Sequence, residues 1–319
     1  MGSRPCGGGT VLSRIAESLF WIGRYIERAD DTARLLDVHV QSLLEDPWAE
    51  EDLACRSLLS VMDSPAPPPT EAVGRAQVLA ILAYDRESPA AIAGALLAAR
   101  ENARRAREVI STELWEAVNA TWNQLPSHLD LSQPHEYFRW VRERAAVVAG
   151  IVDSATARDD TWRFLVLGRS IERADMTARL LTMRALAGAG GPTRSTLLRS
   201  CGAHEAYLRR YRGIDSDDSA AGFLLRDQLF PRSIVHALAE AEACLSVLGP
   251  PGERATEDAA RMRLGHARTS LEYRPLRDVL DRLPAKMETV QRACSAASDE
   301  VRARYFPSRA TTTWVGEAL

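Results

Sequence analysis

Two segments of the chain nearly repeat each other, and this repeat constrains the fold more than any other feature of the sequence. Residues 23–36 read GRYIERADDTARLL, and residues 168–181 read GRSIERADMTARLL. Each segment is dense in arginine and acidic residues, yet its apolar residues recur at the three- and four-residue spacing of a helix. The chain therefore contains one charged helix twice, at a separation of roughly 145 residues.

The similarity extends beyond these two helices. LAYDRESPAAI at residues 82–92 aligns with LLRDQLFPRSI at residues 224–234, with a leucine, an aspartate, a proline and the last isoleucine in register. This pattern predicts a tandem duplication of the whole unit, because so long a period does not suggest a short-repeat solenoid. We expect the two units to be related by a pseudo-twofold axis, with the divisions 1–12 (tail), 13–157 (first unit), 158–306 (second unit) and 307–319 (tail).

Helical periodicity runs through nearly every segment, and strand-like alternation is hard to find. The predicted fold class is therefore an all-α helical bundle. We expect helices to begin at three prolines, because proline is tolerated at the first helical position: Pro89, Pro134 and Pro231. The main breaks are expected at residues 63–70, 187–193 and 248–253, which are rich in proline and glycine.

The composition is that of a globular protein, with 319 residues of which 46% are hydrophobic. A formal net charge of −3 gives the chain no long-range attraction for nucleic acid or an anionic membrane, and we expect neither as a partner. The five cysteines lie far apart without a C-x-x-C pair, as in reduced cytosolic proteins. Because the sequence shows no long apolar run and no signal-peptide core, we expect a cytoplasmic location.

The first charged helix has two distinct faces at about 100° per residue. One face is an apolar stripe, which should be core: Leu19, Ile22, Ile26, Ala29, Ala33 and Leu36. The other face mixes large apolar residues with charges: Phe20, Trp21 and Leu35 among Arg24, Glu27, Arg28, Asp31 and Arg34. A solvent-exposed face would not normally contain three such apolar residues, so we expect protein to cover the charged face as well.

Covered charges need partners, and the spacing within the helix offers them. We expect Arg24 to pair with Glu27, or Arg28 with Asp31, and Asp30 to pair with Arg34. The second helix retains most of this set, namely Arg169, Glu172, Arg173, Asp175 and Arg179. It has Met176 at the position of Asp31, so the second site lacks one acid.

Two interpretations of the charged helices stay open at this point. In the first, the arginines and acids satisfy one another and fix the packing of the two halves. In the second, the arginines bind a carboxylate or phosphate, and Glu27 and Glu172 are a catalytic acid–base pair whose pKa burial raises toward neutrality. The substrate-binding candidates are then Arg24, Arg28, Asp31, Arg34, Arg169, Arg173, Asp175 and Arg179.

A second charged constellation lies in residues 99–119, ARENARRAREVISTELWEAVN. Such a ladder is usually a solvated surface. However, the aligned segment of the second half reads EACLS where the first reads RENAR, so an asymmetric function could reside here. We therefore add Arg100, Glu101, Asn102 and Arg104 to the substrate-binding candidates.

Motifs for metal and nucleotide chemistry are missing from the sequence. The six histidines lack zinc-ligand spacing, no helical E-x-x-H occurs, and CGGGT near the start lacks the lysine of a phosphate loop. We expect neither a metal nor a cofactor.

The chain resembles the alpha-E family of all-helical bacterial proteins, which are named for a Glu-Arg motif and typically built as a tandem duplication. The resemblance lies in LSRIAESLFWIGRYIERADDTARLL, ARENARRAREVISTELWEAVN, WRFLVLGRSIERADMTARLL and FPRS, and it covers most of residues 12–306. The family's Glu-Arg pair corresponds to Glu27 with Arg28 and to Glu172 with Arg173. Members typically occur beside, or fused to, circularly permuted ATP-grasp ligases, transglutaminase-like proteins and N-terminal-nucleophile hydrolases.

This resemblance implies an accessory protein of an ATP-dependent peptide synthesis or modification system. It would bind a peptide or amino-acid substrate. Its partners would be a circularly permuted ATP-grasp ligase and also a transglutaminase-like protein. One alternative is a stand-alone enzyme that uses Glu27 and Glu172 on an anionic or amide substrate. Another is a non-catalytic helical scaffold.

Overall fold

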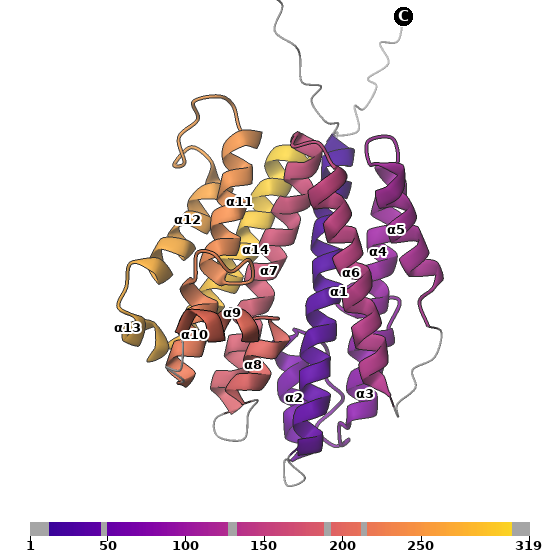
Figure 1. Cartoon of the computed structure of the whole chain (residues 1–319), viewed down its shortest axis with the longest axis vertical. Coiled ribbons are helices and arrows are strands. Elements are labelled where there is room, and N and C mark those ends of the chain that lie inside the picture. Colours follow the sequence, from indigo (N-terminus) through magenta and orange to yellow (C-terminus); the bar gives the residue numbers. More distant parts are fainter. Residues whose placement is uncertain (1–12, 46–49, 127–132, 188–192, 212–215, 308–319) are drawn as a thin grey trace, which may run out of the picture.

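The structure is a computed structural model that describes residues 13–45, 50–126, 133–187, 193–211 and 216–307 (Figure 1). Every regular element within these residues is a helix, so the predicted all-α class is confirmed. The tails expected at 1–12 and 307–319 lie outside the described residues, apart from Pro307. None of the described helices combines the length and apolar character that crossing a membrane requires.

The helices of the first half are α1 (Ser13–Glu45), α2 (Glu51–Val61), α3 (Arg75–Leu79), the π-helix η1 (Ala80–Tyr84), α4 (Ile92–Arg105), α5 (Thr112–Asn123) and α6 (Pro134–Ala155). Those of the second half are α7 (Asp160–Ala187), α8 (Arg194–Ser200), α9 (His204–Tyr211), α10 (Asp217–Arg226), α11 (Ile234–Leu248), α12 (Ala259–Glu272), α13 (Leu276–Leu280) and α14 (Leu283–Tyr305). The unit boundary expected at residues 157–158 falls between α6 and α7.

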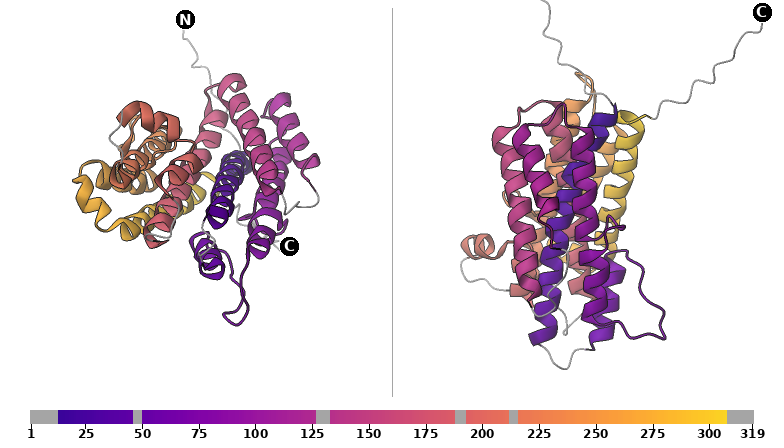
Figure 2. Two further views of the ribbon diagram at one scale, coloured as in Figure 1. Left: turned by 60° about the horizontal axis from the view of Figure 1, so that its bottom comes forward. Right: turned by 90° about the vertical axis from the view of Figure 1, so that its right-hand side faces the viewer.

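The long helices form two groups of four that meet at α1 and α7 (Figures 1 and 2). In the first group α1 packs on α4 and α6, with α5 behind them, and in the second group α7 packs on α11 and α14, with α12 behind them. Two short helices cross between the groups, since α2 packs on α7 and α8 packs on α1. The central pair α1 and α7 therefore contacts elements from both halves.

Burial along α1 follows the predicted faces. The expected apolar stripe is buried throughout, with Ile26 its most exposed member at 7%. The opposite face is covered as well, because Phe20 and Leu35 are buried and Trp21 is half-buried. α1 is thus enclosed on both faces, and its charged side chains lie inside the protein.

Two glycines allow α1 and α7 to cross closely. A Cβ atom at Gly23 would overlap the carbonyl oxygen of Leu165, and one at Gly168 would overlap that of Phe20. Each glycine therefore receives the backbone of the opposite helix, which is the role that a missing side chain permits. The contacts are reciprocal, as a twofold arrangement of two equivalent helices requires. The duplication of the complete unit stays a prediction.

The helix starts agree only in part with the expected proline positions. α6 begins at Pro134, as predicted. The prediction was wrong for α4 and α11, which begin three residues after Pro89 and Pro231. In the second half, the Asp227 carboxylate accepts the backbone N–H groups of Leu229 and Phe230, so the chain makes a turn before the helix begins.

The breaks are mostly where they were expected. Residues 63–70 form no helix, and α11 ends at Leu248. The break expected at residues 187–193 lies almost entirely outside the described residues.

Gly168→Ala tests the crossing. The added methyl group meets a backbone carbonyl, which can move only if α1 and α7 separate. We therefore expect the free energy of unfolding to fall by about 3 kcal/mol, the upper end of the usual cost of overpacking. Gly150→Ala on α6 is the matched control, because nothing lies within 4 Å of its added Cβ. That control should gain about 0.5–1 kcal/mol from helix propensity. Urea denaturation of both variants measures the difference, and a mild effect of Gly168→Ala would contradict the close crossing.

Candidate functional site

The Glu-Arg residues of the two charged helices pair across the crossing. Glu172 on α7 accepts hydrogen bonds from Arg24 Nε at 2.7 Å and from Arg28 Nε and Nη2 at 2.5 and 3.0 Å, both arginines lying on α1. Glu27 on α1 accepts from Arg173 Nε and Nη2 on α7 at 2.7 and 2.9 Å. We call these residues the Glu-Arg clamp: Arg24, Glu27, Arg28, Glu172 and Arg173.

The expected pairing of Arg24 with Glu27 and of Arg28 with Asp31 was therefore wrong. The glycine crossing brings the opposite helix within reach, and a bidentate arginine–carboxylate pair formed there has better geometry than a pair along one helix. The i+4 pairs did form: Asp30 with Arg34 at 3.1 Å, as predicted, and its equivalent Asp175 with Arg179 at 2.8 Å.

The two ends of the clamp differ by one acid and one arginine. Arg232, which precedes α11, donates to Glu27 at 2.8 Å and also pairs with Asp30 and Asp31. In the alignment of the two halves, Arg232 corresponds to Ala90 and Asp31 corresponds to Met176. The additional acid and the additional arginine thus occur together, which explains why the second helix can lack an acid.

Arg232 is the site residue that the sequence analysis missed. Its side chain is largely buried, at 14% exposure, although it lies about 200 positions from its partners. The available signal was the arginine of FPRS, which has alanine as its counterpart in SPAA.

The remaining residue of the predicted set, Arg169, belongs to the edge of the clamp. Its counterpart Arg24 binds Glu172, but Arg169 binds Asp153 on α6 through both terminal nitrogens, at 3.0 and 3.1 Å. All eight candidates on the two charged helices therefore lie in or beside one network.

The electrostatics of the clamp hold both glutamates in the ionised form. Burial alone would raise the pKa of a carboxyl group. The surrounding arginines outweigh burial, and they lower the pKa of Glu27 and of Glu172 to about 2. The expectation that burial raises these pKa values toward neutrality was therefore wrong. Neither side chain is suited to exchange a proton near neutral pH.

Asp31 shows the opposite behaviour. Burial, together with the nearby carboxylates of Glu27 and Asp30, raises the pKa of Asp31 to about 8 in spite of Arg232. One oxygen of Asp31 is buried without a hydrogen-bond partner. A proton on that oxygen relieves the repulsion among three acids that share one guanidinium group.

The same three acids have carboxylate oxygens within 4.8 Å of one another, a spacing that could hold a cation. Arg232 already contacts all three of them. The position that a cation would take is therefore held by a guanidinium group.

A cavity of about 270 Å³ lies beside the Glu27 end of the clamp, between α1, α6 and α7. Its wall is mainly apolar, and Arg169 and Arg173 contribute polar atoms. Glu172 is not among its lining residues. At the other end Arg24 donates to Ser298 Oγ of α14 at 2.7 Å, so α14 covers that end. Of the two glutamates, only Glu27 lines this cavity between the described helices.

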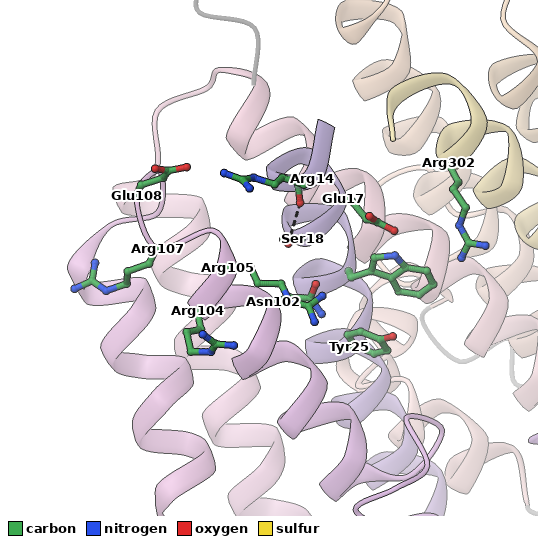
Figure 3. Close-up of a pocket in the computed structure, with 11 residues that line it drawn as sticks. Arg14, Glu17, Ser18, Tyr25, Asn102, Arg104, Arg105, Arg107, Glu108 and Arg302 are labelled. Atoms are coloured by element: carbon green, nitrogen blue, oxygen red, sulfur yellow. Dashed lines mark hydrogen bonds between the residues drawn. The ribbon is translucent and has the colours of Figure 1, made fainter. Parts of the chain in front are cut away.

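The four candidates on α4 lie apart from the clamp. Arg100 donates to Asn119 at 2.8 Å and pairs with Glu101, and Glu101 also accepts from Arg104, both at 3.0 Å. Asn102 donates to the Ala98 carbonyl at 2.8 Å. Asn102 and Arg104 line a second cavity, an open groove of about 820 Å³ (Figure 3). We call this cavity the arginine groove; its other lining residues include Arg14, Trp21, Tyr25, Arg105, Arg107 and Arg302.

Comparison with known proteins assigns the chain to a family. A family described as "a predicted alpha-helical domain with a conserved ER motif", Alpha-E, matches residues 11–306. The chain belongs to the Alpha-E family. The reciprocal clamp of Glu27 with Arg173 and of Glu172 with Arg28 shows how its two Glu-Arg motifs are used in this member.

The relatives found by comparison are uncharacterized mycobacterial proteins. One from Mycobacterium bovis and two from strains of Mycobacterium tuberculosis are each 26% identical over 284 residues, covering 78% of this chain and 31% of the relative. The chain thus spans about a third of the length of the curated relatives it matches. No solved structure matches the chain.

Glu172→Gln should destabilise the protein more than Glu27→Gln. Loss of Glu172 leaves the buried Arg24 and the half-buried Arg28 without their acid, so we expect a loss of about 3–5 kcal/mol at pH 7. When Glu27 is replaced, the pKa of Asp31 falls, because the Glu27 carboxylate helps to raise it. Asp31 can then ionise and compensate Arg232, so the decrease in stability should be smaller. The control is Glu143→Gln, a 68% exposed side chain, with an effect within about 0.5 kcal/mol. Denaturant melts giving the reverse order would contradict this account.

Asp31 predicts a pH dependence of stability. Its folded pKa of about 8 lies above the ordinary value of 3.8, so the folded state binds more protons between these values. Stability should therefore fall as pH rises from about 4 to 8 and then level off. Asp31→Asn should remove this part of the slope and match or exceed the wild type at pH 8. Urea denaturation at pH 5, 6.5 and 8 measures it, and a variant less stable than wild type at pH 8 would show an ionised Asp31.

Proposed function

We propose that this Alpha-E protein is the accessory, substrate-binding component of an ATP-dependent peptide synthesis or modification system. Its partner would be a circularly permuted ATP-grasp ligase, with a transglutaminase-like protein as a further member, in the cytoplasm. The observation that carries the proposal is the closed clamp. Because Glu27 and Glu172 are each held by two arginines and have pKa values of about 2, the motif organises the fold and leaves chemistry to a partner.

The relatives support a role for this chain alongside a second protein or domain. In each of them the matching region makes up 31% of the chain, so most of the relative is additional sequence. The family resemblance implies genes or domains of ATP-grasp ligases nearby, and such a ligase would supply the phosphate and magnesium ligands that ATP chemistry needs. A division of labour follows, in which the ligase activates a carboxylate and this chain binds the substrate.

The arginine groove supports the substrate-binding part of the proposal. It is open, and it has the size of a ligand pocket. Its arginines suit a carboxylate-bearing peptide or amino acid. A pure scaffold would use the clamp but would need no such groove.

The two alternatives fare differently. A stand-alone enzyme with Glu27 and Glu172 as acid and base is disfavoured, because its proton donor and acceptor would be ionised at neutral pH. The scaffold is the second candidate, and the closed pairing of the clamp favours it.

The four described cysteines are buried free thiols, which agrees with a reducing cytoplasmic setting.

Association with a ligase is the direct test. The chain should co-elute in size-exclusion chromatography with a co-expressed ATP-grasp ligase encoded beside it, and should hydrolyse no ATP when purified alone. An unrelated ATP-grasp ligase is the control and should elute separately. Hydrolysis of ATP by the isolated chain, or failure to co-elute with the neighbouring ligase, would overturn the proposal.

A further inference from the structure

The arginine groove contains cations that the fold leaves unpaired. Arg14, Arg105, Arg107 and Arg302 make no ion pair and no side-chain hydrogen bond with the described residues, although Arg107 lies 5.6 Å from the ring centre of Trp115. In the clamp, by contrast, every arginine has an acid partner. Converging like charges repel one another, so their placement around one cavity suits an anionic ligand.

Three separate parts of the chain build this groove. Arg14 lies at the start of α1, Arg105 at the end of α4, and Arg302 near the end of α14. Figure 3 shows Arg302 on the opposite side of the groove from Arg104 and Arg107, with Tyr25 between them. Tyr25 stacks on Trp21 with ring centres 5.2 Å apart. The groove thus has cations on two sides of an aromatic surface, which fits an extended ligand with several anionic groups.

The acceptors in the groove favour a peptide over a nucleic acid. Glu17 and Glu108 line it too, and their carboxylates would repel a continuous phosphate backbone. A peptide backbone instead supplies N–H donors for such carboxylates. Asn102 uses its amide nitrogen on Ala98, which leaves its side-chain oxygen as a further acceptor. The combination matches acidic side chains with arginines and backbone amides with acceptors.

The groove has no equivalent in the second half of the chain. In the alignment of the halves, Asn102, Arg104, Arg105 and Arg107 correspond to Cys244, Ser246, Val247 and Gly249. The equivalent helix α11 therefore forms without charged residues at these positions, so the helical fold itself does not require the charges on α4. These charges are confined to one place on the molecule.

We propose that the arginine groove binds an acidic peptide segment, with Arg14, Arg105, Arg107 and Arg302 contacting its carboxylates and Glu17, Asn102 and Glu108 accepting its backbone N–H groups. This inference rests on the proposed function only in that the acidic peptide would be the substrate of the accessory component. The volume of about 820 Å³ accommodates a few residues. Because the contacts are charge-assisted and exposed, binding should weaken as salt is added.

Fluorescence anisotropy with fluorescein-labelled hexaglutamate and the purified full chain tests this inference. The double variant Arg105→Gln/Arg302→Gln should weaken binding by about tenfold or more, because it removes two charge-assisted contacts. The matched control is Arg139→Gln/Arg292→Gln, which removes the same charge from exposed arginines whose nearest acids are 4.0 and 3.8 Å away. The control should bind within about twofold of the wild type.

The outcomes are distinct. The inference is supported if the groove variant loses hexaglutamate binding and the control variant retains it. If that result is obtained but no ligase co-elutes, the proposed function alone fails. No hexaglutamate binding by the wild type would overturn the inference. So would equal weakening in both double variants, equal binding of labelled hexaglutamine, or tighter binding of a labelled oligothymidylate of the same charge.

Discussion

The reciprocal salt bridges across the crossing of α1 and α7 are the interaction on which the rest of the structure depends. Gly23 and Gly168 let the two backbones meet, and only at this separation can Glu27 reach Arg173 and Glu172 reach Arg28. Removing these charges from water is costly unless each is paired with good geometry. Since each helix holds the acid that the other requires, neither half can bury its charged helix alone. The clamp therefore couples the two halves in folding as well as in space.

The departure from symmetry is as informative as the symmetry. At one end of the clamp α14 closes over Arg24 through Ser298, and at the other end Arg232 enters and α6 leaves a cavity. Arg232 draws three acids together, and burial, reinforced by the neighbouring carboxylates of Glu27 and Asp30, raises the pKa of Asp31. A single substitution pattern, arginine with aspartate in one half and alanine with methionine in the other, thus changes the electrostatics of one end only.

The sequence predicted those features that depend on local periodicity. The apolar stripe of α1 and the cover over its charged face followed from the positions of residues such as Ile22 and Phe20, which one helix wheel displays. Salt-bridge partners were not predictable in this way, because Glu27 lies one helical turn from Arg24 in the sequence, whereas the observed partner Glu172 lies 148 positions away. The choice between them depends on how closely two helices cross, and the role of the two glycines in that crossing became apparent only from the contacts.

The arginine groove lay beyond sequence reasoning for the same reason. Arg104 and Asn102 were singled out because the second half lacks them, but Arg302 lies about 200 residues further on. Nothing in the pattern of α14 marks one exposed arginine near its end as different from the others. Only the packing of the helices against α1 brings these cations to one groove (Figure 3).

Arginine therefore has two opposite uses in this protein, and the difference decides where a ligand can bind. An anion that entered the clamp would have to displace a buried carboxylate whose arginines hold its pKa at about 2, and the displaced acid would then lie unpaired in the interior. An anion that binds Arg14, Arg105, Arg107 and Arg302 in the groove displaces only water, because these four arginines have no acid partner among the described residues. Each exposed contact is weak, so affinity requires several anionic groups on one ligand. The motif that defines the family thus holds the fold together, and binding of an anion is favoured at the charges that the motif does not use.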